Sequence, residues 1–560
     1  MRIVIYEIRE KIIQGIKDAL VKAQEKGEIN LEVSPEIHLE VPREKNHGDY
    51  ATNAALVMAK QAKMPPRKVA EAIVNNLAAE DLFEKVEIAG PGFINFFLTN
   101  RWLGDVLEVI GEQGENYGEI NLGEDRLLQI EYVSANPTGP VHVGHGRGAA
   151  VGSVLAKILE KSRFKVVQEH YTNDAGNQMN NCGKSVFARY QELLGKKVDF
   201  PEDGYHGDYI YDVAKKFIDQ AGDKYLDHTD EEALPIFREF ALQELGAKLK
   251  EDLKAFGVEF DVWFSEKSLH EAGEIAKTTE YLKEKGNIYE KDGALWLNST
   301  QFGDDKDRVV IRENGIPTYL AADIAYHKNK FERGFAKVIN IWGADHHGYI
   351  KRMKAAVEAL GYSGEDLEVL IMQLVTYLRN GKPVAMSKRT GEFITLRDVI
   401  EEIGKDAARY FYIMRNPNSP LDFDLELAKE KSSENPVYYI QYAHARICSL
   451  LRMGKEQGVS LPKAKDINLE VLVQEVELDL IKKLAELPLE IRESALAREP
   501  HKIARYAYDL AGLFHAFYNS CRILGEGEEV LLARLCLAQA TGQVLRNTLD
   551  ILGLSAPERM

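Results

Sequence analysis

The sequence predicts an α/β protein: a doubly wound parallel sheet with a helical insertion, a small α+β domain before it and an all-helical domain after it. Three observations support this. The chain opens with a helical pattern and two strand-like runs, buried-strand runs precede helices in its middle, and helical periodicity fills its end. At roughly 100–200 residues per domain, 560 residues suffice for about three or four domains.

The small α+β domain is expected over residues 1–110. Ile12, Ile16 and Leu20 recur at helical spacing, which predicts an amphipathic helix. Two strand-like runs, 86–88 and 93–98, are separated by the turn sequence Ala-Gly-Pro-Gly.

The sheet domain is expected over residues 111–424. The apolar run 126–133 suits a buried parallel strand. A second run, 338–342, precedes a helix over 349–360, and this strand-then-helix alternation is typical of a doubly wound sheet. From 187 to about 300 the composition is helical and strongly charged, which predicts a largely helical insertion.

The all-helical domain is expected over residues 425–560, where helical periodicity is almost unbroken. Apolar residues make up 45% of the chain and charged residues 28%, so we expect it to fold throughout. No run approaches the roughly 18 apolar residues of a membrane span, and the start lacks the apolar stretch of a signal peptide. We therefore expect a cytoplasmic protein without a membrane partner.

Charge and cysteine content restrict the classes of partner. The formal net charge is −17, so a nucleic acid would have to be met by local basic patches. The four cysteines lack any C-x-x-C spacing, which argues against a structural zinc site or a disulfide framework. No metal site is predicted.

The most informative stretch follows the first buried strand. There a Pro/Gly turn leads into a helix of small residues that begins near Gly144, so backbone N–H groups and the positive end of the helix dipole converge on a phosphate site. His142 and His145 lie three residues apart and are suited to stabilise charge on an α-phosphate. Two alternatives remain: a metal-binding pair and unrelated surface histidines.

A second basic stretch lies between an apolar run, 369–377, and a helix that begins near Thr395. It reads GKPVAMSKRTG, and its Lys388 and Arg389 suit transient binding of a triphosphate. Taken alone, a solvated basic turn is the simpler interpretation.

HVGH followed far downstream by MSKRTG resembles the paired signatures of class I aminoacyl-tRNA synthetases. NPTGPVHVGHGRGA, YTNDAGNQ, YLAADIAYH, GADHHGY and NPVYYIQYAHAR are similar to stretches of the arginine-specific family, in family order. The resemblance covers nearly the whole chain. It implies a Rossmann-type core, ATP with Mg²⁺, adenylation of L-arginine, its transfer to the 3′-terminal adenosine of tRNA(Arg), and a helical anticodon-binding domain.

By this resemblance His142, His145 and Lys388 would be catalytic. The ATP-binding residues would be His142, Gly144, His145, Met386, Ser387, Lys388 and Arg389. One departure concerns the first position of the second signature, where class I enzymes usually carry Lys and this chain has Ala385. What replaces that lysine is open, with Lys382 or Arg389 as possible helpers.

The amino-acid pocket should contain carboxylates, because arginine presents a planar cation. By resemblance Tyr319 and Asp323, four residues apart on a predicted helix, would bind the guanidinium. The arginine-binding set would be Glu131, Ser134, Asn136, Tyr319, Asp323 and Asp345. For Asp323 a solvated or capping acid is the alternative, and for Asp345 a metal site with the two histidines that follow it.

The tRNA-reading surface is expected on a helix that begins with Asn435 and Pro436, a side-chain cap and a favoured first residue. Its aromatic stripe would ordinarily be core, but the resemblance favours stacking of unpaired bases. The predicted tRNA-binding residues are Asn95 in the first domain and Tyr438, Gln441, Tyr442 and Arg446 on this helix.

Two other functions remain as alternatives. A class I synthetase of another specificity, such as cysteine, should show a zinc-binding cysteine set, and none exists here. A non-catalytic tRNA-binding paralogue should have lost His142, His145 or Lys388, and all three are present. We expect a monomer.

Overall fold

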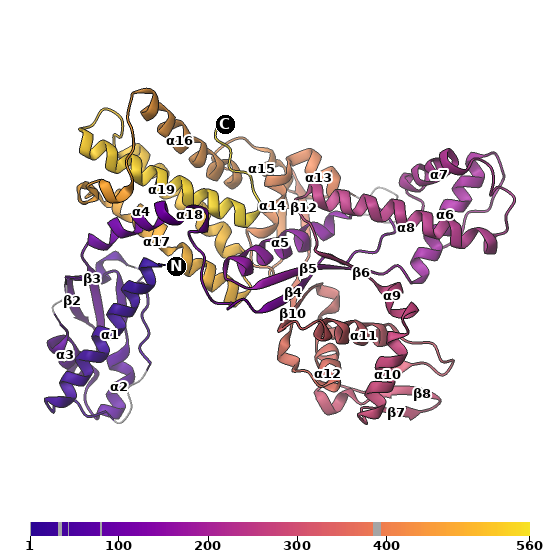
Figure 1. Ribbon diagram of the computed structural model, residues 1–560, viewed down its shortest axis with the longest axis horizontal. Coiled ribbons are helices and arrows are strands. Elements are labelled where there is room, and N and C mark those ends of the chain that lie inside the picture. Colours follow the sequence, from indigo (N-terminus) through magenta and orange to yellow (C-terminus); the bar gives the residue numbers. More distant parts are fainter. Residues whose placement is uncertain (1, 32–35, 43, 79–80, 385–393) are drawn as a thin grey trace.

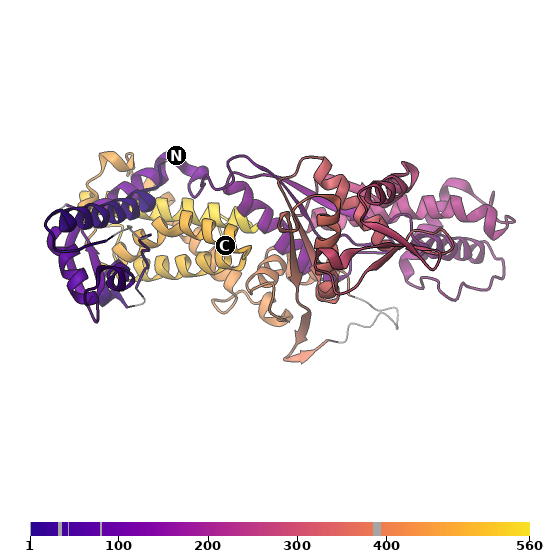
Figure 2. The ribbon, with the colours of Figure 1, turned by 90° about the horizontal axis from the view of Figure 1, so that it is seen from below.

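A computed structural model of the chain describes residues 2–31, 36–42, 44–78, 81–384 and 394–560. The molecule is elongated, and its N-terminal part and an arm of three helices lie at opposite ends (Figure 1). The view from below shows the same separation (Figure 2). Among the helices of the described ranges, none is long and apolar enough to cross a membrane.

The N-terminal part packs three helices against a small antiparallel sheet of strand order β1-β3-β2. The predicted amphipathic helix is confirmed as α1, whose buried face includes Ile12, Ile16 and Leu20. The elements are α1 (Val4–Glu25), β1 (Tyr50–Thr52), α2 (Ala54–Ala62), α3 (Pro66–Asn76), β2 (Phe83–Ala89) and β3 (Phe93–Leu98). Helix α4 (Arg101–Gln113) follows, spans the boundary predicted at residue 110 and packs on the C-terminal helices.

The central sheet is five-stranded, wholly parallel and ordered β11-β10-β4-β5-β6, which confirms the predicted fold class. Its strands are β4 (Leu127–Glu131), β5 (Lys165–Thr172), β6 (Val262–Ser265), β10 (Lys337–Gly343) and β11 (Leu367–Met372). The chain moves outward from β4 to β6 and then returns to the other side of β4 with β10. The crevice between the carboxyl ends of β4 and β10 is therefore the switch point, where ligands bind in such sheets.

Helices cover both faces of this sheet (Figure 1). Ile130 and Ile339 point into one core with α5 (Gly146–Lys161), and Val338 points into another with α11 (Tyr319–Glu332) and α12 (Ile350–Leu360). Neighbouring strand residues such as Val338 and Ile339 serve opposite faces because side chains alternate along a strand.

The segment predicted as a helical insertion divides into two parts around a sheet strand. Helices α6 (Asn177–Leu193), α7 (Asp208–Ala221) and α8 (Asp230–Ala255) form an arm with its own core. Strand β6, inside the predicted range, pairs with β5 in the main sheet. This four-residue strand is too short to show as a periodic run within a charged helical composition. After it come α9 (Glu266–Glu271), α10 (Glu274–Glu284) and a small sheet of β7 (Ile288–Lys291), β8 (Ala294–Leu297) and β9 (Arg308–Ile311).

A third small sheet joins the central domain to the C-terminal helices. Its strands β12 (Val375–Arg379) and β14 (Leu421–Asp424) are parallel, and β13 (Lys382–Pro383) pairs antiparallel with β12. Around it lie α13 (Leu396–Ile403), α14 (Lys405–Ile413) and α15 (Leu425–Lys429).

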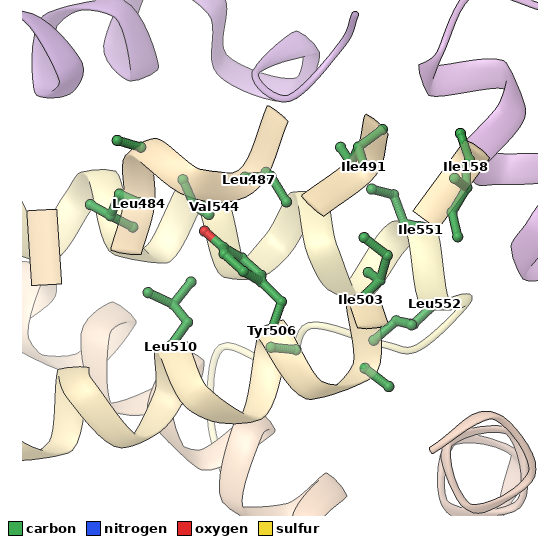
Figure 3. Close-up of a cluster of buried hydrophobic side chains, with 14 of the residues drawn as sticks. Ile158, Leu484, Leu487, Ile491, Ile503, Tyr506, Leu510, Val544, Ile551 and Leu552 are labelled. Carbon is green, nitrogen blue, oxygen red and sulfur yellow. The ribbon is translucent and has the colours of Figure 1, made fainter. Parts of the chain in front are cut away.

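The C-terminal part is a helical bundle, as predicted. Its helices are α16 (Pro436–Glu456), α17 (Glu475–Ala497), α18 (His501–Ser520) and α19 (Glu528–Leu552). Figure 3 shows Leu487 of α17, Tyr506 of α18 and Val544 of α19 in one apolar cluster, with Ile158 of α5 beside Ile551. The bundle thus shares a core with the helix that follows HVGH.

Candidate functional site

The HVGH stretch lies at the switch point, between the end of β4 and the start of α5. Val143–His145 forms a 3-10 turn that continues directly into α5. The Nδ1 atom of His142 accepts a hydrogen bond of 2.9 Å from the backbone N–H of Gly144. The rings of His142 and His145 are 6.5 Å apart and nearly perpendicular. The predicted arrangement of strand, turn and helix is confirmed, and it directs backbone N–H groups of a helix start toward the sheet edge.

The second signature, 385–393, lies outside the described residues, so the roles of Ala385, Met386, Ser387, Lys388 and Arg389 stay predictions. The residues on either side of it are described. Val384 N–H donates to the Tyr377 carbonyl at 2.8 Å on one side.

On the other side, Val143 N–H donates to the Ile394 carbonyl at 3.2 Å, and Leu396 N–H donates to the Val141 carbonyl at 2.8 Å. The chain on the far side of the second signature is thus paired with the HVGH turn. The tertiary structure thus brings Ile394 and Leu396, about 250 residues further along the chain, to the HVGH turn.

A buried polar network lies below this edge. Lys330, whose side chain is 0% exposed, donates to Glu131 at 2.6 Å and to the Asn340 side-chain oxygen at 2.8 Å. Asn340 in turn contacts the Nε2 atom of His327 at 2.9 Å. Ser134 donates to the other oxygen of Glu131 at 2.8 Å. Glu131 is therefore a fully paired carboxylate at the end of β4, whose remaining lone pairs can still accept hydrogen bonds.

Strained backbone follows Glu131. Val133 and Ser134 have φ values of 70° and 40°. A β-branched residue at positive φ is a genuine outlier, and such strain is concentrated at functional sites. Here it directs the Ser134 hydroxyl toward Glu131 while that hydroxyl accepts from the Tyr171 N–H at 3.2 Å.

Asp323 is the second carboxylate of this site. It accepts a hydrogen bond of 2.6 Å from the Tyr349 hydroxyl. Burial, together with the nearby charges of Glu131 and Glu266, raises the pKa of Asp323 to about 7 against the opposing effects of Tyr349 and Lys330. The carboxylate is poised to ionise fully when a cation approaches.

The other predicted arginine-binding residues lie around the rim. Tyr319 is the first residue of α11 and is 69% exposed. Asn136 donates a side-chain hydrogen bond to Gln178 of α6. Asp345 follows β10 at the carboxyl edge, as predicted, but its side chain is largely exposed and lies 3.5 Å from His346.

Sequence reasoning missed Lys330, His327 and Tyr349. A signal for the first two existed, because Asp323, His327 and Lys330 recur at i, i+4 and i+7 on one face of this helix. Polar residues on the buried face of a helix need partners and so mark a site. Tyr349 lies outside that helix, and no local pattern indicates its contact.

The predicted tRNA-reading helix is α16, and its start is confirmed: Asn435 accepts a hydrogen bond of 3.0 Å from Val437 N–H, and Pro436 follows it. Tyr438 and Tyr442 are stacked at 6.0 Å with their planes 13° apart. Arg446 lies over the Tyr442 ring at 4.5 Å and donates to its hydroxyl. Tyr442 is 36% exposed, so this stripe is a surface feature and not core.

Gln441 lies beside a cavity of about 400 Å³ between α16, the start of α14 and the C-terminal tail. Its amide donates to Asp406 at 2.8 Å and to Ser555 at 3.0 Å. Asn95, by contrast, is only 5% exposed within β3, so the predicted tRNA contact of Asn95 finds no support. The apolar strand around it explains why its side chain is covered.

Comparison with known proteins places the whole chain in one family. Three family models match in order: "Arginyl tRNA synthetase N terminal domain" over 10–98, "tRNA synthetases class I (R), catalytic domain" over 106–419 and "DALR anticodon binding domain" over 440–560. Arginine–tRNA ligases of Desulforamulus reducens and Carboxydothermus hydrogenoformans are each 52% identical to this chain over 100% of both sequences.

Solved structures agree with this assignment. A putative arginyl-tRNA synthetase from Campylobacter jejuni is 36% identical with a TM-score of 0.77, covering 83% of this chain and 100% of that one. The Thermus thermophilus arginyl-tRNA synthetase shares the fold at 22% identity, with a TM-score of 0.74 and coverage of 99% and 100%. The chain belongs to the arginyl-tRNA synthetase family of class I aminoacyl-tRNA synthetases.

Proposed function

We propose that this protein is an arginine–tRNA ligase. It adenylates L-arginine with ATP and transfers the arginyl group to the 3′-terminal adenosine of tRNA(Arg), releasing pyrophosphate and then AMP. Among class I specificities, the observation that favours arginine is Asp323, a half-buried carboxylate with a raised pKa at the switch point. A cationic side chain supplies the positive countercharge that favours the ionised form of this carboxylate.

In the first step an arginine carboxylate oxygen attacks the α-phosphorus of ATP, and the bond from that phosphorus to the bridging oxygen breaks. The protein need supply no nucleophile, only position and charge stabilisation. His142, His145 and the backbone N–H groups at the start of α5 hold the phosphate oxygens. Lys388, with Met386, Ser387 and Arg389, is assigned to the triphosphate, which is expected to arrive as its magnesium complex.

The two ends of arginine are bound separately. Asp323 and Tyr319 receive the guanidinium, and Glu131, Ser134 and Asn136 orient the α-amino end. Asp345 is assigned to the rim of the same pocket. Glu131 can accept from the ammonium group because each of its oxygens retains a free lone pair beside Lys330 and Ser134.

In the second step a hydroxyl of the terminal ribose attacks the arginyl carbonyl carbon, and AMP leaves. Tyr438, Gln441, Tyr442 and Arg446 are assigned to unpaired bases of the tRNA, because stacked rings and a guanidinium suit base faces and edges. We infer a cytoplasmic monomer that needs bound tRNA for arginine activation.

Amino-acid-dependent exchange of pyrophosphate into ATP tests this proposal. We expect exchange with arginine plus tRNA, and with no other amino acid. The variant His145→Asn serves as a control for contaminating host enzyme and should lose about 10²-fold or more. No exchange with arginine plus tRNA would refute the proposal, and exchange at full rate without tRNA would refute the tRNA requirement.

A further inference from the structure

Two tyrosines are buried directly beneath the HVGH turn. Tyr377 of β12 is 3% exposed and Tyr412 of α14 is 0% exposed. Both rings pack on Phe423, at 5.3 Å and 4.9 Å. Phenylalanine would fill this apolar space without a polar atom to satisfy, so the two hydroxyl groups call for an explanation.

Both hydroxyl groups converge on one backbone atom. The Val143 carbonyl oxygen lies 3.1 Å from the Tyr377 hydroxyl and 3.3 Å from the Tyr412 hydroxyl, and the two hydroxyl groups are 2.7 Å apart. Each phenol has a single hydrogen, so two hydrogens serve three contacts. One phenol donates to the other while the second donates to Val143, and the pair forms a shared donor.

Val143 is the residue between His142 and Gly144, and its carbonyl belongs to the turn that presents both histidines. The same carbonyl accepts from Gly146 N–H at the start of α5. Fixing this oxygen therefore fixes the orientation of the turn relative to the helix.

Tyr377 also bonds through its backbone to the residue that precedes the second signature. Its carbonyl accepts from Val384, the residue immediately before the stretch 385–393. A single residue thus bonds to the HVGH turn by its side chain and, by its main chain, to the last described residue before the second signature.

Gly146 shows how closely Tyr412 packs against the start of α5. A Cβ atom at Gly146 would lie 2.6 Å from the Tyr412 hydroxyl oxygen, which is closer than real contacts allow. Gly146, the second residue of the HGRG sequence (145–148), must therefore lack a side chain because the Tyr412 ring edge and hydroxyl occupy that space.

We propose that Tyr377 and Tyr412 are positioning residues that hold the HVGH turn in place, through the Val143 carbonyl, against α14 and the strand β12. The proposal rests on the adenylation chemistry assigned above. Because the histidines stabilise charge that develops in the transition state, misplacing them should lower kcat and leave KM for arginine nearly unchanged.

The test uses Tyr377→Phe, Tyr412→Phe and the double variant in arginine-dependent exchange with tRNA. Either single variant leaves one phenol to donate to Val143, so kcat should fall only about threefold. The double variant removes the shared donor, and kcat should fall about 30-fold, beyond the product of the single effects. KM for arginine should stay within about twofold of wild type.

Tyr410→Phe is the matched control. Tyr410 lies on α14 as well and is 4% exposed, but its hydroxyl donates to the Ala504 carbonyl of α18 at 3.2 Å. This variant should keep the wild-type kcat while losing a similar amount of thermal stability.

The inference is overturned if the double variant has the kcat of Tyr410→Phe, or if its loss appears in KM alone. Single effects that simply multiply would also overturn it, because they would mean independent roles. If wild type exchanges with an amino acid other than arginine, the proposed function fails, but the same kcat ratios measured with that amino acid still decide the role of the tyrosines.

Discussion

The carboxyl edge of the central sheet and the exposed face of α16 handle charge in opposite ways. At the sheet edge, Glu131 is buried and Asp323 is half-buried, and the pKa of Asp323 is raised to about 7, mainly by its burial. On α16, Arg446 is half-buried and lies over the exposed ring of Tyr442. One region suits a small cation and the other a nucleic acid.

The difference shows how selectivity depends on burial. A buried carboxylate without enough countercharge discriminates strongly, because an uncharged ligand leaves it unpaired. An exposed ring beside a guanidinium tolerates many bases, since every base has a face to stack. The net charge of −17 does not predict which ligand either region binds, because the local charge of each region depends on a few residues.

The largest effect is expected for Asp323→Asn. Removing the charge should lower kcat/KM for arginine about 10³-fold, since a buried guanidinium loses its charged partner. Exchange kinetics at saturating ATP and tRNA measure this. Glu332→Gln, the equivalent change at an exposed position of the same helix, should have no effect. A loss below about tenfold would place the guanidinium partner elsewhere.

A smaller effect is expected for Tyr442→Ala on the other region. Loss of one stacking ring, worth about 1–3 kcal/mol, should raise KM for tRNA about 10- to 100-fold and leave KM for arginine at saturating tRNA unchanged. Tyr289→Ala, at a tyrosine of similar exposure in β7 (38%), serves as the control. Equal tRNA KM values for both variants would mean that α16 does not stack bases.

The smallest effect concerns pH. Arginine binding requires ionised Asp323, whose pKa is about 7 in the free protein, so kcat/KM for arginine should fall as pH drops below about 7, tenfold per unit. Tyr349→Phe should move this midpoint to higher pH, because the Tyr349 hydroxyl stabilises the carboxylate. If kcat/KM for arginine does not change with pH, or if KM for tRNA changes with the same midpoint, the two regions do not differ in the way described above.

Local sequence determined those features that depend on neighbours in the chain. Asn435 and Pro436 predict the start of α16 because capping needs only the first turn of a helix. The HVGH turn is likewise predictable, since strand, Pro/Gly turn and helix follow one another without a gap. The resemblance then assigned family and function, which spacing alone could not do.

Only the tertiary structure decided the features that depend on burial and on distant partners. Glu131 and Lys330 are 199 residues apart, and the pKa of Asp323 depends on the packing that excludes water from it. Packing also placed β6 in the main sheet and covered Asn95. Desolvation and contacts between distant segments act only once the chain has folded, so periodicity and spacing can mark such residues but do not give their partners or their pKa values.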